Sequence, residues 1–201
     1  MLLDRPTTHT LEEMLDKFAV KELIEYERFC RDNALWEKMH TCFAEDSTVR
    51  ISWYQGTGHG FVDASRGMKM RAPHKLNSTL VWLHGGRAAA VTMGCIQSRK
   101  VLDGAAMDLT SYARFLYTAR RENRIWKVVS MDCIYEKDTL TPAGPAPFPP
   151  GERESYANLT RVIGAEGYGI APDLPGDDRP ELVEALYQKA SGWLETGEAS
   201  L

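Results

Sequence analysis

The stretch from Val20 to Phe43 constrains the fold most, because two apolar helical patterns flank a short polar break. It reads VKELIEYERFC, then Arg31-Asp32-Asn33, then ALWEKMHTCF. Apolar residues recur three and four positions apart on both sides of the break, which indicates two α-helices. The residues that follow carry the pattern of β-strands. We therefore expect a helical hairpin, bent at Asp32, that closes over a curved sheet.

The first helix is predicted to begin at Leu11, because Thr10 is a good N-cap and acidic residues follow it in the first turn. Its apolar spacing continues to about Arg31. The second helix is predicted from Leu35 to Phe43. A short third helix is expected over residues 61–70, after a glycine-rich loop at residues 55–60 that lacks the lysine of a phosphate-binding loop.

The middle of the chain has the alternation and turn residues of an antiparallel meander. Glycine-containing turns are predicted at His84–Arg87 and Asp103-Gly104, and a polar turn at Arg121–Arg124. Both faces of these strands carry apolar residues, as expected where one face packs on helices and the other lines a cavity or an interface. The predicted strands are 47–53, 76–83, 88–102, 107–119 and 125–135.

The composition of the chain changes near residue 141, where a proline-rich stretch begins. Residues 142–151 are expected to form a semi-extended linker, and Pro180 is expected to open a final helix. We therefore predict one domain over residues 1–140, followed by a linker and a C-terminal helical extension over residues 141–201.

The bulk properties of the chain exclude several kinds of partner. The formal net charge of -4 offers no basic surface for nucleic acid, and no apolar run is long enough to span a membrane. The first ten residues lack the features of a signal peptide. The four cysteines are scattered, without a CxxC pair, so a cytoplasmic location is predicted. No histidines have metal-ligand spacing, so no metal is expected.

The order of the predicted elements, together with several short motifs, resembles the SnoaL-like branch of the NTF2-like superfamily over roughly residues 11–140. This resemblance implies an α+β fold, an NTF2-like cone in which N-terminal helices cover a curved antiparallel sheet. It also implies a homodimer or homotrimer, and a pocket between helices and sheet for a hydrophobic small molecule. The matching motifs are Val20-Lys21-Glu22-Leu23-Ile24, Asp32 with Trp36, Phe43-Ala44-Glu45-Asp46, Pro73-His74 and Ile125-Trp126-Lys127.

The resemblance also implies a catalytic pair. Cofactor-free dehydratases, dehydrochlorinases, isomerases and polyketide cyclases of this group use an Asp–His pair at the places that Asp32 and His74 hold here. A tyrosine expected just before the aspartate is offset, because Glu27 holds the matching place and Tyr26 is its neighbour. We take Tyr26 as the third catalytic candidate, a donor to a developing oxyanion or a leaving hydroxyl.

The pair makes chemical sense, because imidazole can take a carbon-bound proton while a carboxylate on its other nitrogen fixes the tautomer. Each residue also has a structural interpretation. Asp32 could cap the second helix or pair with Arg28 one turn earlier. His74 could be an exposed residue at the edge of a strand.

Further residues are candidates for binding a substrate. Trp53, Tyr54 and Tyr112 could line a pocket, although aromatic residues at these spacings also build cores. His40 could either reach the pocket or cover the apolar face of its helix. By alternation, Asp132 shares a face with Trp126 and Val128 and is expected to be buried with a partner.

Two functions follow from these residues. The first is a cofactor-independent lyase or isomerase that acts on a hydrophobic cyclic compound through Asp32 and His74. The second is a non-catalytic protein of the same fold that binds a small molecule or acts as an oligomeric scaffold, because a fold does not determine a function.

Overall fold

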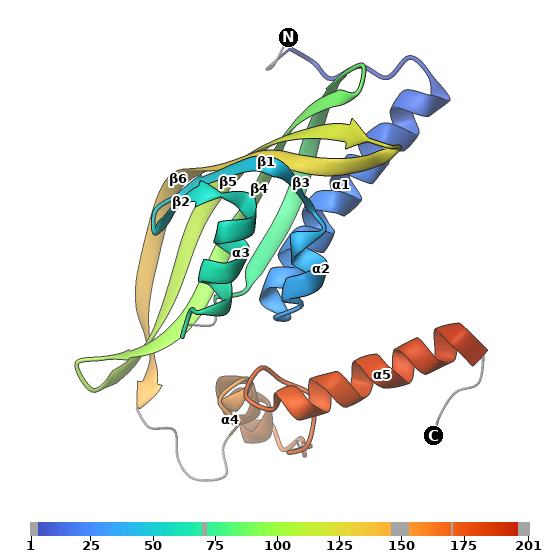
Figure 1. Ribbon diagram of the computed structural model, residues 1–201. Helices are drawn as coiled ribbons and strands as arrows, with labels where there is room; N and C mark the ends of the chain where they lie inside the picture. Colours follow the sequence, from blue (N-terminus) through green and yellow to red (C-terminus); the bar gives the residue numbers. More distant parts are fainter. Residues whose placement is uncertain (1–3, 70–71, 146–152, 170, 197–201) are drawn as a thin grey trace. The chain divides into compact units, whose positions relative to one another are not determined.

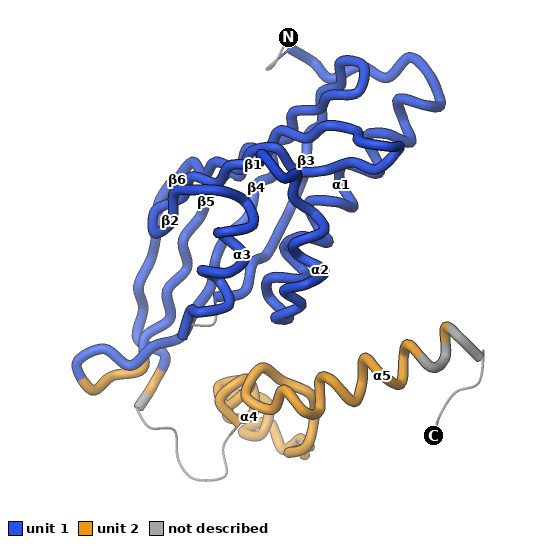
Figure 2. The backbone as a smooth tube through the Cα atoms, in the orientation of Figure 1, with its two compact units in different colours: residues 1–103, 107–143 blue, residues 104–106, 144–201 orange. Residues whose placement is uncertain are grey.

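The computed structural model describes residues 4–69, 72–145, 153–169 and 171–196. Its contacts divide the chain into two compact units, one of residues 1–103 and 107–143, the other of residues 104–106 and 144–201 (Figure 2). The first unit holds three helices and, except for the first two residues of β5 and the last two of β6, a six-stranded sheet with strand order β2-β1-β6-β5-β4-β3 (Figure 1). Its helices are α1 (Leu11–Asp32), α2 (Trp36–His40) and α3 (Gly58–Arg66), and its strands are β1 (Phe43–Ile51), β2 (Tyr54–Thr57), β3 (His74–His84), β4 (Arg87–Leu102), β5 (Ala105–Glu122) and β6 (Ile125–Pro145).

Helix α1 begins where the sequence predicts it. The Thr10 hydroxyl accepts a hydrogen bond from the Glu13 N–H, and the Glu13 carboxylate accepts one from the Thr10 N–H, which completes a capping box. The helix buries Val20, Ile24 and Cys30 on one face. It continues to Asp32, so Asp32 ends α1 and does not cap α2, whose N-cap is Leu35.

The predicted second helix is too long. Helix α2 ends at His40, and Phe43 already belongs to β1, where it pairs with Val128 of β6. The local apolar pattern cannot distinguish a last helical turn from the start of a buried strand. The chain turns between α1 and α2 at Ala34, whose φ is 56°.

The sheet is curved and unclosed, and with its helices it forms the expected α+β fold. It is mixed and not wholly antiparallel, because β1 pairs with β6 in parallel and with β2 in an antiparallel ladder. The β3–β4, β4–β5 and β5–β6 turns fall where predicted, and each has a residue with positive φ. In the last turn these are Asn123 and Arg124, at 50° and 72°, as in a type I′ hairpin.

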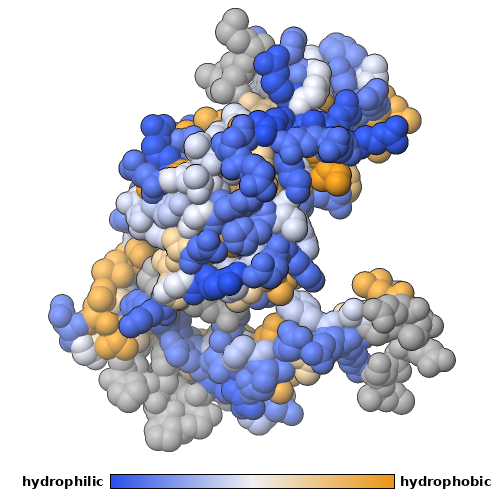
Figure 3. Space-filling view, in the orientation of Figure 1, coloured by the Kyte–Doolittle hydropathy of each residue, from blue (hydrophilic) through white to orange (hydrophobic). Residues whose placement is uncertain are grey.

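The core of the first unit lies between the inner face of this sheet and helices α1 to α3. Helix α1 packs against β3, and α3 packs against β1 and β2. Large fully buried side chains come from both layers, among them Ile24, Phe61 and Tyr117. Most of the visible surface is hydrophilic (Figure 3), with an apolar patch at the end of the β4–β5 hairpin, where Val101 and Leu102 are exposed.

Two predicted boundaries differ from the structure. Residues 55–60 are not a loop, because β2 includes Gln55 to Thr57 and α3 starts at Gly58, with the Thr57 hydroxyl accepting from the Gly60 N–H. Strand β6 continues past Tyr135 into the predicted linker, and ends at Pro145. The rest of that linker, residues 146–151, lies outside the described residues.

The second unit contains α4 (Ala157–Ala165) and α5 (Pro180–Thr196), and Pro180 opens the last helix as predicted. Arg153 and Asp178 form a two-pronged ion pair at 2.7 and 2.8 Å. Ser155 also donates to Asp178 at 2.7 Å. No helix in the described parts of the chain is long and apolar enough to cross a membrane.

Candidate active site

The end of α1 and the start of β3 bring Asp32 and His74 into direct contact, 42 residues apart in the sequence. Oδ1 of Asp32 lies 2.8 Å from Nδ1 of the His74 ring. Its Oδ2 accepts a hydrogen bond of 2.6 Å from the His74 backbone N–H. One carboxylate therefore fixes both the main chain and the ring of the histidine.

The register of β3 and β4 places His74 at this position. His74 lies opposite Ile96 and Leu76 lies opposite Gly94. A Cβ atom at Gly94 would lie 2.5 Å from the Lys75 carbonyl oxygen, which is closer than atoms can approach. The missing side chain at Gly94 therefore allows β3 to approach β4 directly after His74.

The second ring nitrogen of His74 faces a buried arginine. Nη1 of Arg28 lies 3.4 Å from Nε2 of His74. A guanidinium group can only donate, so Nε2 must be the acceptor and Nδ1 must carry the proton, which it donates to Asp32. The surroundings thus select one neutral tautomer of the imidazole.

The electrostatics of the pair agree with this assignment. Burial, with smaller contributions from the positive charges of Arg28 and Arg31, lowers the pKa of His74 to about 4, although Asp32 opposes the change. Burial on its own would raise the pKa of Asp32. The hydrogen bonds and charge of His74 nevertheless hold the pKa of Asp32 below its ordinary value. At neutral pH the site therefore holds an aspartate and a neutral histidine.

Arg28 is held by a second carboxylate, that of Glu27. Nε of Arg28 donates to Oε2 of Glu27 at 2.5 Å, and Nη2 donates to Oε1. The Tyr117 hydroxyl of β5 also donates to Oε2, at 3.4 Å. Burial on its own would lower the pKa of Arg28, but the carboxylate of Glu27 raises the pKa of Arg28 above its ordinary value. Glu27 is fully buried and Arg28 is 3% exposed.

This group was not predicted as part of the site, although the sequence contains a signal for it. Glu27 follows Ile24 by three residues and Val20 by seven, which places a carboxylate on the apolar face of α1. A charged residue on that buried face of the helix needs a buried partner. Arg28 is its neighbour, and it lies one helical turn before Asp32.

Apolar rings surround the charged groups. The His74 ring contacts the Phe115 ring edge-on, with centroids 5.9 Å apart. The guanidinium of Arg28 lies 5.5 Å from the centre of the Phe61 ring. The His74 side chain is 5% exposed and that of Asp32 is 15% exposed. Little water therefore screens the charges of this site.

The structure does not bring Tyr26 to this pair. Tyr26 is 42% exposed and lines a different groove of about 770 Å³, together with Phe29 and Trp126. Each residue of an α-helix turns by about 100°, so Tyr26 points about 160° away from Arg28. The expected role of Tyr26 beside His74 is therefore wrong in its geometry.

Two of the aromatic candidates lie against Phe61, a ring that also faces the guanidinium of Arg28. Trp53 and Tyr54 contact the Phe61 ring at 5.6 and 5.7 Å, and Trp53 is 42% exposed. Tyr112 is 39% exposed, with the Lys137 ammonium 5.5 Å from its ring centre.

His40 lies in a separate polar cluster on α2 and α3. Its Nε2 is 3.2 Å from Oδ1 of Asp63, and its ring lies 4.9 Å from that of His59. Among the described residues, no group of three or more histidines, cysteines and acids is arranged to hold a metal ion.

Asp132 does not share a face with Val128, contrary to the alternation argument. Val128 and Met131 both belong to the core although they are three residues apart, and the ladder between β1 and β6 shifts its register at this place. The irregularity reverses the alternation. Asp132 therefore lies on the opposite face from Met131, where its Oδ1 accepts a hydrogen bond of 2.9 Å from Nε of Arg50.

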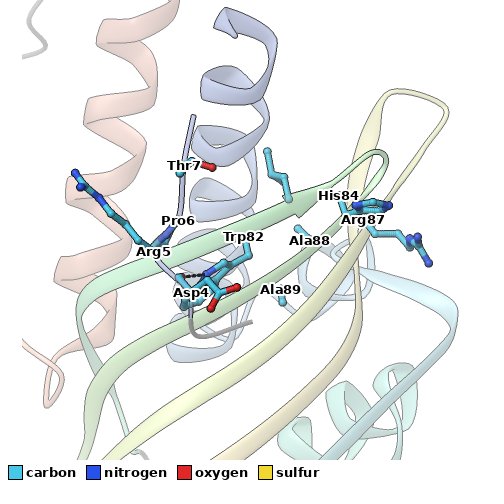
Figure 4. A pocket seen from close by; sticks show the side chains of 10 residues that line it. Asp4, Arg5, Pro6, Thr7, Trp82, His84, Arg87, Ala88 and Ala89 are labelled. Carbon is cyan, nitrogen blue, oxygen red and sulfur yellow. Dashed lines mark hydrogen bonds between the residues drawn. The ribbon is translucent and has the colours of Figure 1, made fainter. Parts of the chain in front are cut away.

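The N-terminal segment forms another pocket, of about 460 Å³ (Figure 4). Residues 4–7 line one side of it and residues of the β3–β4 hairpin line the other. The indole N–H of Trp82 donates to the Asp4 carbonyl at 2.7 Å, which ties the segment to the sheet. None of the predicted site residues lines this pocket.

Comparison with known proteins places these observations in a family. The model of the SnoaL-like domain matches residues 12–132. A PEP2-like protein of Fusarium vanettenii is 29% identical over 90% of this chain and 87% of its own length. Pea pathogenicity protein 2 of the same fungus is 27% identical over 90% of this chain and 86% of its own length.

Solved structures share the fold at low sequence identity. The hexachlorocyclohexane dehydrochlorinase LinA type 3 of Novosphingobium barchaimii aligns with a TM-score of 0.58 and 13% identity, covering 70% of this chain and 99% of that chain. A protein of Novosphingobium aromaticivorans, provisionally assigned as a scytalone dehydratase, aligns with a TM-score of 0.54 and 14% identity. That alignment covers 67% of this chain and 95% of the other.

Proposed function

The chain belongs to the SnoaL-like family, and from this premise we propose that it is a cofactor-independent lyase or isomerase acting on a hydrophobic cyclic compound. His74 is the base and Asp32 orients it. The observation that supports this proposal most is the contact of 2.8 Å between Oδ1 of Asp32 and Nδ1 of His74. It gives the ring the tautomer in which Nε2 carries the lone pair.

The first chemical step is proton transfer from carbon. Nε2 of His74 takes a proton from a carbon next to a carbonyl group, and the C–H electron pair forms a carbon–carbon double bond as the carbonyl becomes an enolate. The imidazolium that results is stabilised by the Asp32 carboxylate on its other side. Because the site is nearly closed to water, this attraction is stronger than it would be in solution.

The second step distinguishes a lyase from an isomerase. In an elimination, the enolate returns its electrons, the carbon–oxygen bond to a β-hydroxyl breaks, and the imidazolium proton leaves with the hydroxyl as water. In an isomerisation, the same proton is delivered to another carbon of the conjugated enolate. Both routes restore neutral His74 and need no cofactor.

The second candidate is a non-catalytic binding or scaffold protein of the same fold. One observation favours it, namely that Nε2 of His74 already has a partner in Arg28. The low pKa of His74, about 4, also makes it a weak base in this arrangement. The homodimer or homotrimer and the cytoplasmic location stay predictions for either function.

Proton exchange tests the proposal without knowledge of the natural substrate. Cyclic ketones of terpenoid, steroid and aromatic type are incubated with the protein in deuterated water, and uptake of deuterium beside the carbonyl is measured by mass spectrometry. We expect His74→Ala to abolish the uptake and to leave the fold intact. The matched control is His84→Ala, because His84 is the exposed last residue of β3. Equal uptake by the two variants would rule out His74 as the base.

A further inference from the structure

We infer that Arg28 is the oxyanion-binding group of this site and that Glu27 is its positioning residue. The ligands of the site are then compounds with an anionic oxygen, such as an enolate or a phenolate, next to the reacting carbon. This inference deepens the proposed function and rests on it for the role of His74. The anion site itself can be tested even if no reaction takes place.

The geometry of the guanidinium supports this assignment. Its Nε and Nη2 edge is taken by the two oxygens of Glu27, in the two-pronged arrangement typical of arginine and carboxylate. That leaves the Nη1 corner, which lies 3.4 Å from Nε2 of His74. A proton donor and a proton acceptor thus stand side by side. This is the pair that removal of a proton beside a carbonyl group requires.

Burial explains why Glu27 is needed. An isolated buried charge is very costly, and Arg28 is 3% exposed. The carboxylate of Glu27 compensates the charge of Arg28 and holds the guanidinium in one orientation. Tyr117 fixes the carboxylate in turn, because its hydroxyl donates to Oε2 and burial raises the pKa of Tyr117, which keeps the hydroxyl protonated.

The contact between Arg28 and His74 also determines which ligands can activate the base. While Nη1 donates to Nε2, the lone pair of His74 is occupied. A ligand shifts this arrangement only if it interacts more favourably with the alternative one. An anionic oxygen provides that difference because it accepts the Nη1–H, whereas a purely apolar ring does not.

An anionic oxygen also makes His74 a better base. The positive charge of Arg28 is one of the causes that lower the pKa of His74. The negative charge that develops on the ligand oxygen during proton transfer offsets that effect. The base is therefore strongest when the compound that it deprotonates forms an enolate at Arg28.

Substituted phenols are the probe, because their phenolate forms resemble a cyclic enolate. Binding of 4-nitrophenol and 4-nitroanisole is measured by calorimetry for the full chain, at a pH where the phenol is ionised. We expect the wild-type protein to prefer the phenolate, and Arg28→Met to weaken phenolate binding by about 10- to 100-fold. Arg114→Met is the matched control, since Arg114 forms an exposed pair with Glu136. An unchanged phenolate affinity of Arg28→Met would overturn the inference.

The pH dependence of phenolate binding tests the role of Glu27, because a merely structural role would not change that dependence. We expect Glu27→Gln to alter the pH dependence of phenolate binding and Glu27→Asp to restore part of it. If Glu27→Gln does not fold, the variant Glu27→Gln with Arg28→Met removes the uncompensated charge, and it should bind phenolate as weakly as Arg28→Met. Tight phenolate binding by this double variant would contradict the inference.

The two proposals can fail separately. His74→Ala should keep the phenolate preference, because it leaves Arg28 and Glu27 in place. Absence of deuterium uptake with intact, Arg28-dependent phenolate binding would refute the lyase or isomerase and support the anion site. Deuterium uptake that depends on His74 with no effect of Arg28→Met would refute the anion site alone.

Discussion

Nη1 of Arg28 lies 3.4 Å from Nε2 of His74, and Asp32 lies 2.8 Å from the opposite nitrogen of the same ring. The imidazole therefore stands between a positive and a negative group. The two groups act in opposite directions on the histidine, since Asp32 favours its protonation and Arg28 opposes it. Burial lowers the pKa of His74 most, and the opposing effects of these two groups adjust it further.

The first prediction concerns these opposing effects. Arg28→Met removes the nearby positive charge, so the pKa of His74 should rise above its value of about 4 in the wild-type protein. Nuclear magnetic resonance of the labelled ring, followed between pH 3 and 8, measures this directly. Arg114→Met is again the control. A pKa of His74 that stays the same in both variants would mean that the charge of Arg28 does not lower it.

The second prediction links the same group to stability. The pKa of His74 is about 4 in the folded chain and about 6.5 in an unfolded one. Between these values the unfolded state binds more protons, so stability falls as the pH decreases. The loss is complete near the folded pKa and amounts to about 3 kcal/mol.

Urea unfolding at a series of pH values checks this prediction. His74→Gln should remove most of the slope between pH 6.5 and 4, because the glutamine amide at this buried position does not titrate. Asp32 contributes only at lower pH, since its own pKa lies below the ordinary value of a carboxyl. A variant that keeps the wild-type slope would show that other residues cause it.

The third prediction is that Asp32→Asn disables the site by reversing the tautomer of His74. Its amide NH2 can donate to Nδ1, which would move the ring proton to Nε2 and direct it at the donor Nη1 of Arg28. We expect activity in the deuterium assay to fall roughly 10²- to 10⁴-fold. Nitrogen chemical shifts of the ring report the tautomer. An unchanged tautomer with full activity would contradict the role of Asp32.

Much of the fold could be predicted from the sequence, because its signals are local. The cap at Thr10, the helical spacing of α1 and the turns between strands all depend on neighbouring residues. The end of α2 and the mixed pairing of β1 depend on contacts with β6, far away in the sequence. For the same reason, the alternation of residues along β6 predicts the wrong face for Asp132. The register shift between β1 and β6 reverses the face on which its side chain lies.

The candidate site shows the same division. Only the family resemblance predicts the pairing of Asp32 with His74, since nothing local in the sequence connects residues that lie 42 positions apart. Tyr26 stands next to the expected position in the sequence, but one residue of an α-helix changes the direction of a side chain by about 100°. The apolar spacing of α1 places Glu27 on the buried face, but the pairing of its carboxylate with the next residue, Arg28, is visible only in the structure.

The last prediction concerns Gly94, which determines how closely β3 approaches β4 beside His74. A Cβ atom there would meet the Lys75 carbonyl oxygen at 2.5 Å and the Leu76 Cα at 3.4 Å. Because both are backbone atoms, they cannot move without shifting the strand. We expect Gly94→Ala to destabilise the protein by about 1–3 kcal/mol.

Gly86→Ala is the matched control, since its nearest neighbour is the Arg121 Cβ at 3.9 Å, an ordinary contact. Gly94→Ala should also change the ring signals of His74, because Lys75 directly follows His74 in β3. A shift of the backbone there would also disturb the hydrogen bond from the His74 N–H to Asp32. Thermal unfolding and the ring spectrum together check this. If Gly94→Ala lowered stability but left the His74 spectrum and phenolate binding unchanged, the register of β3 would not position the site.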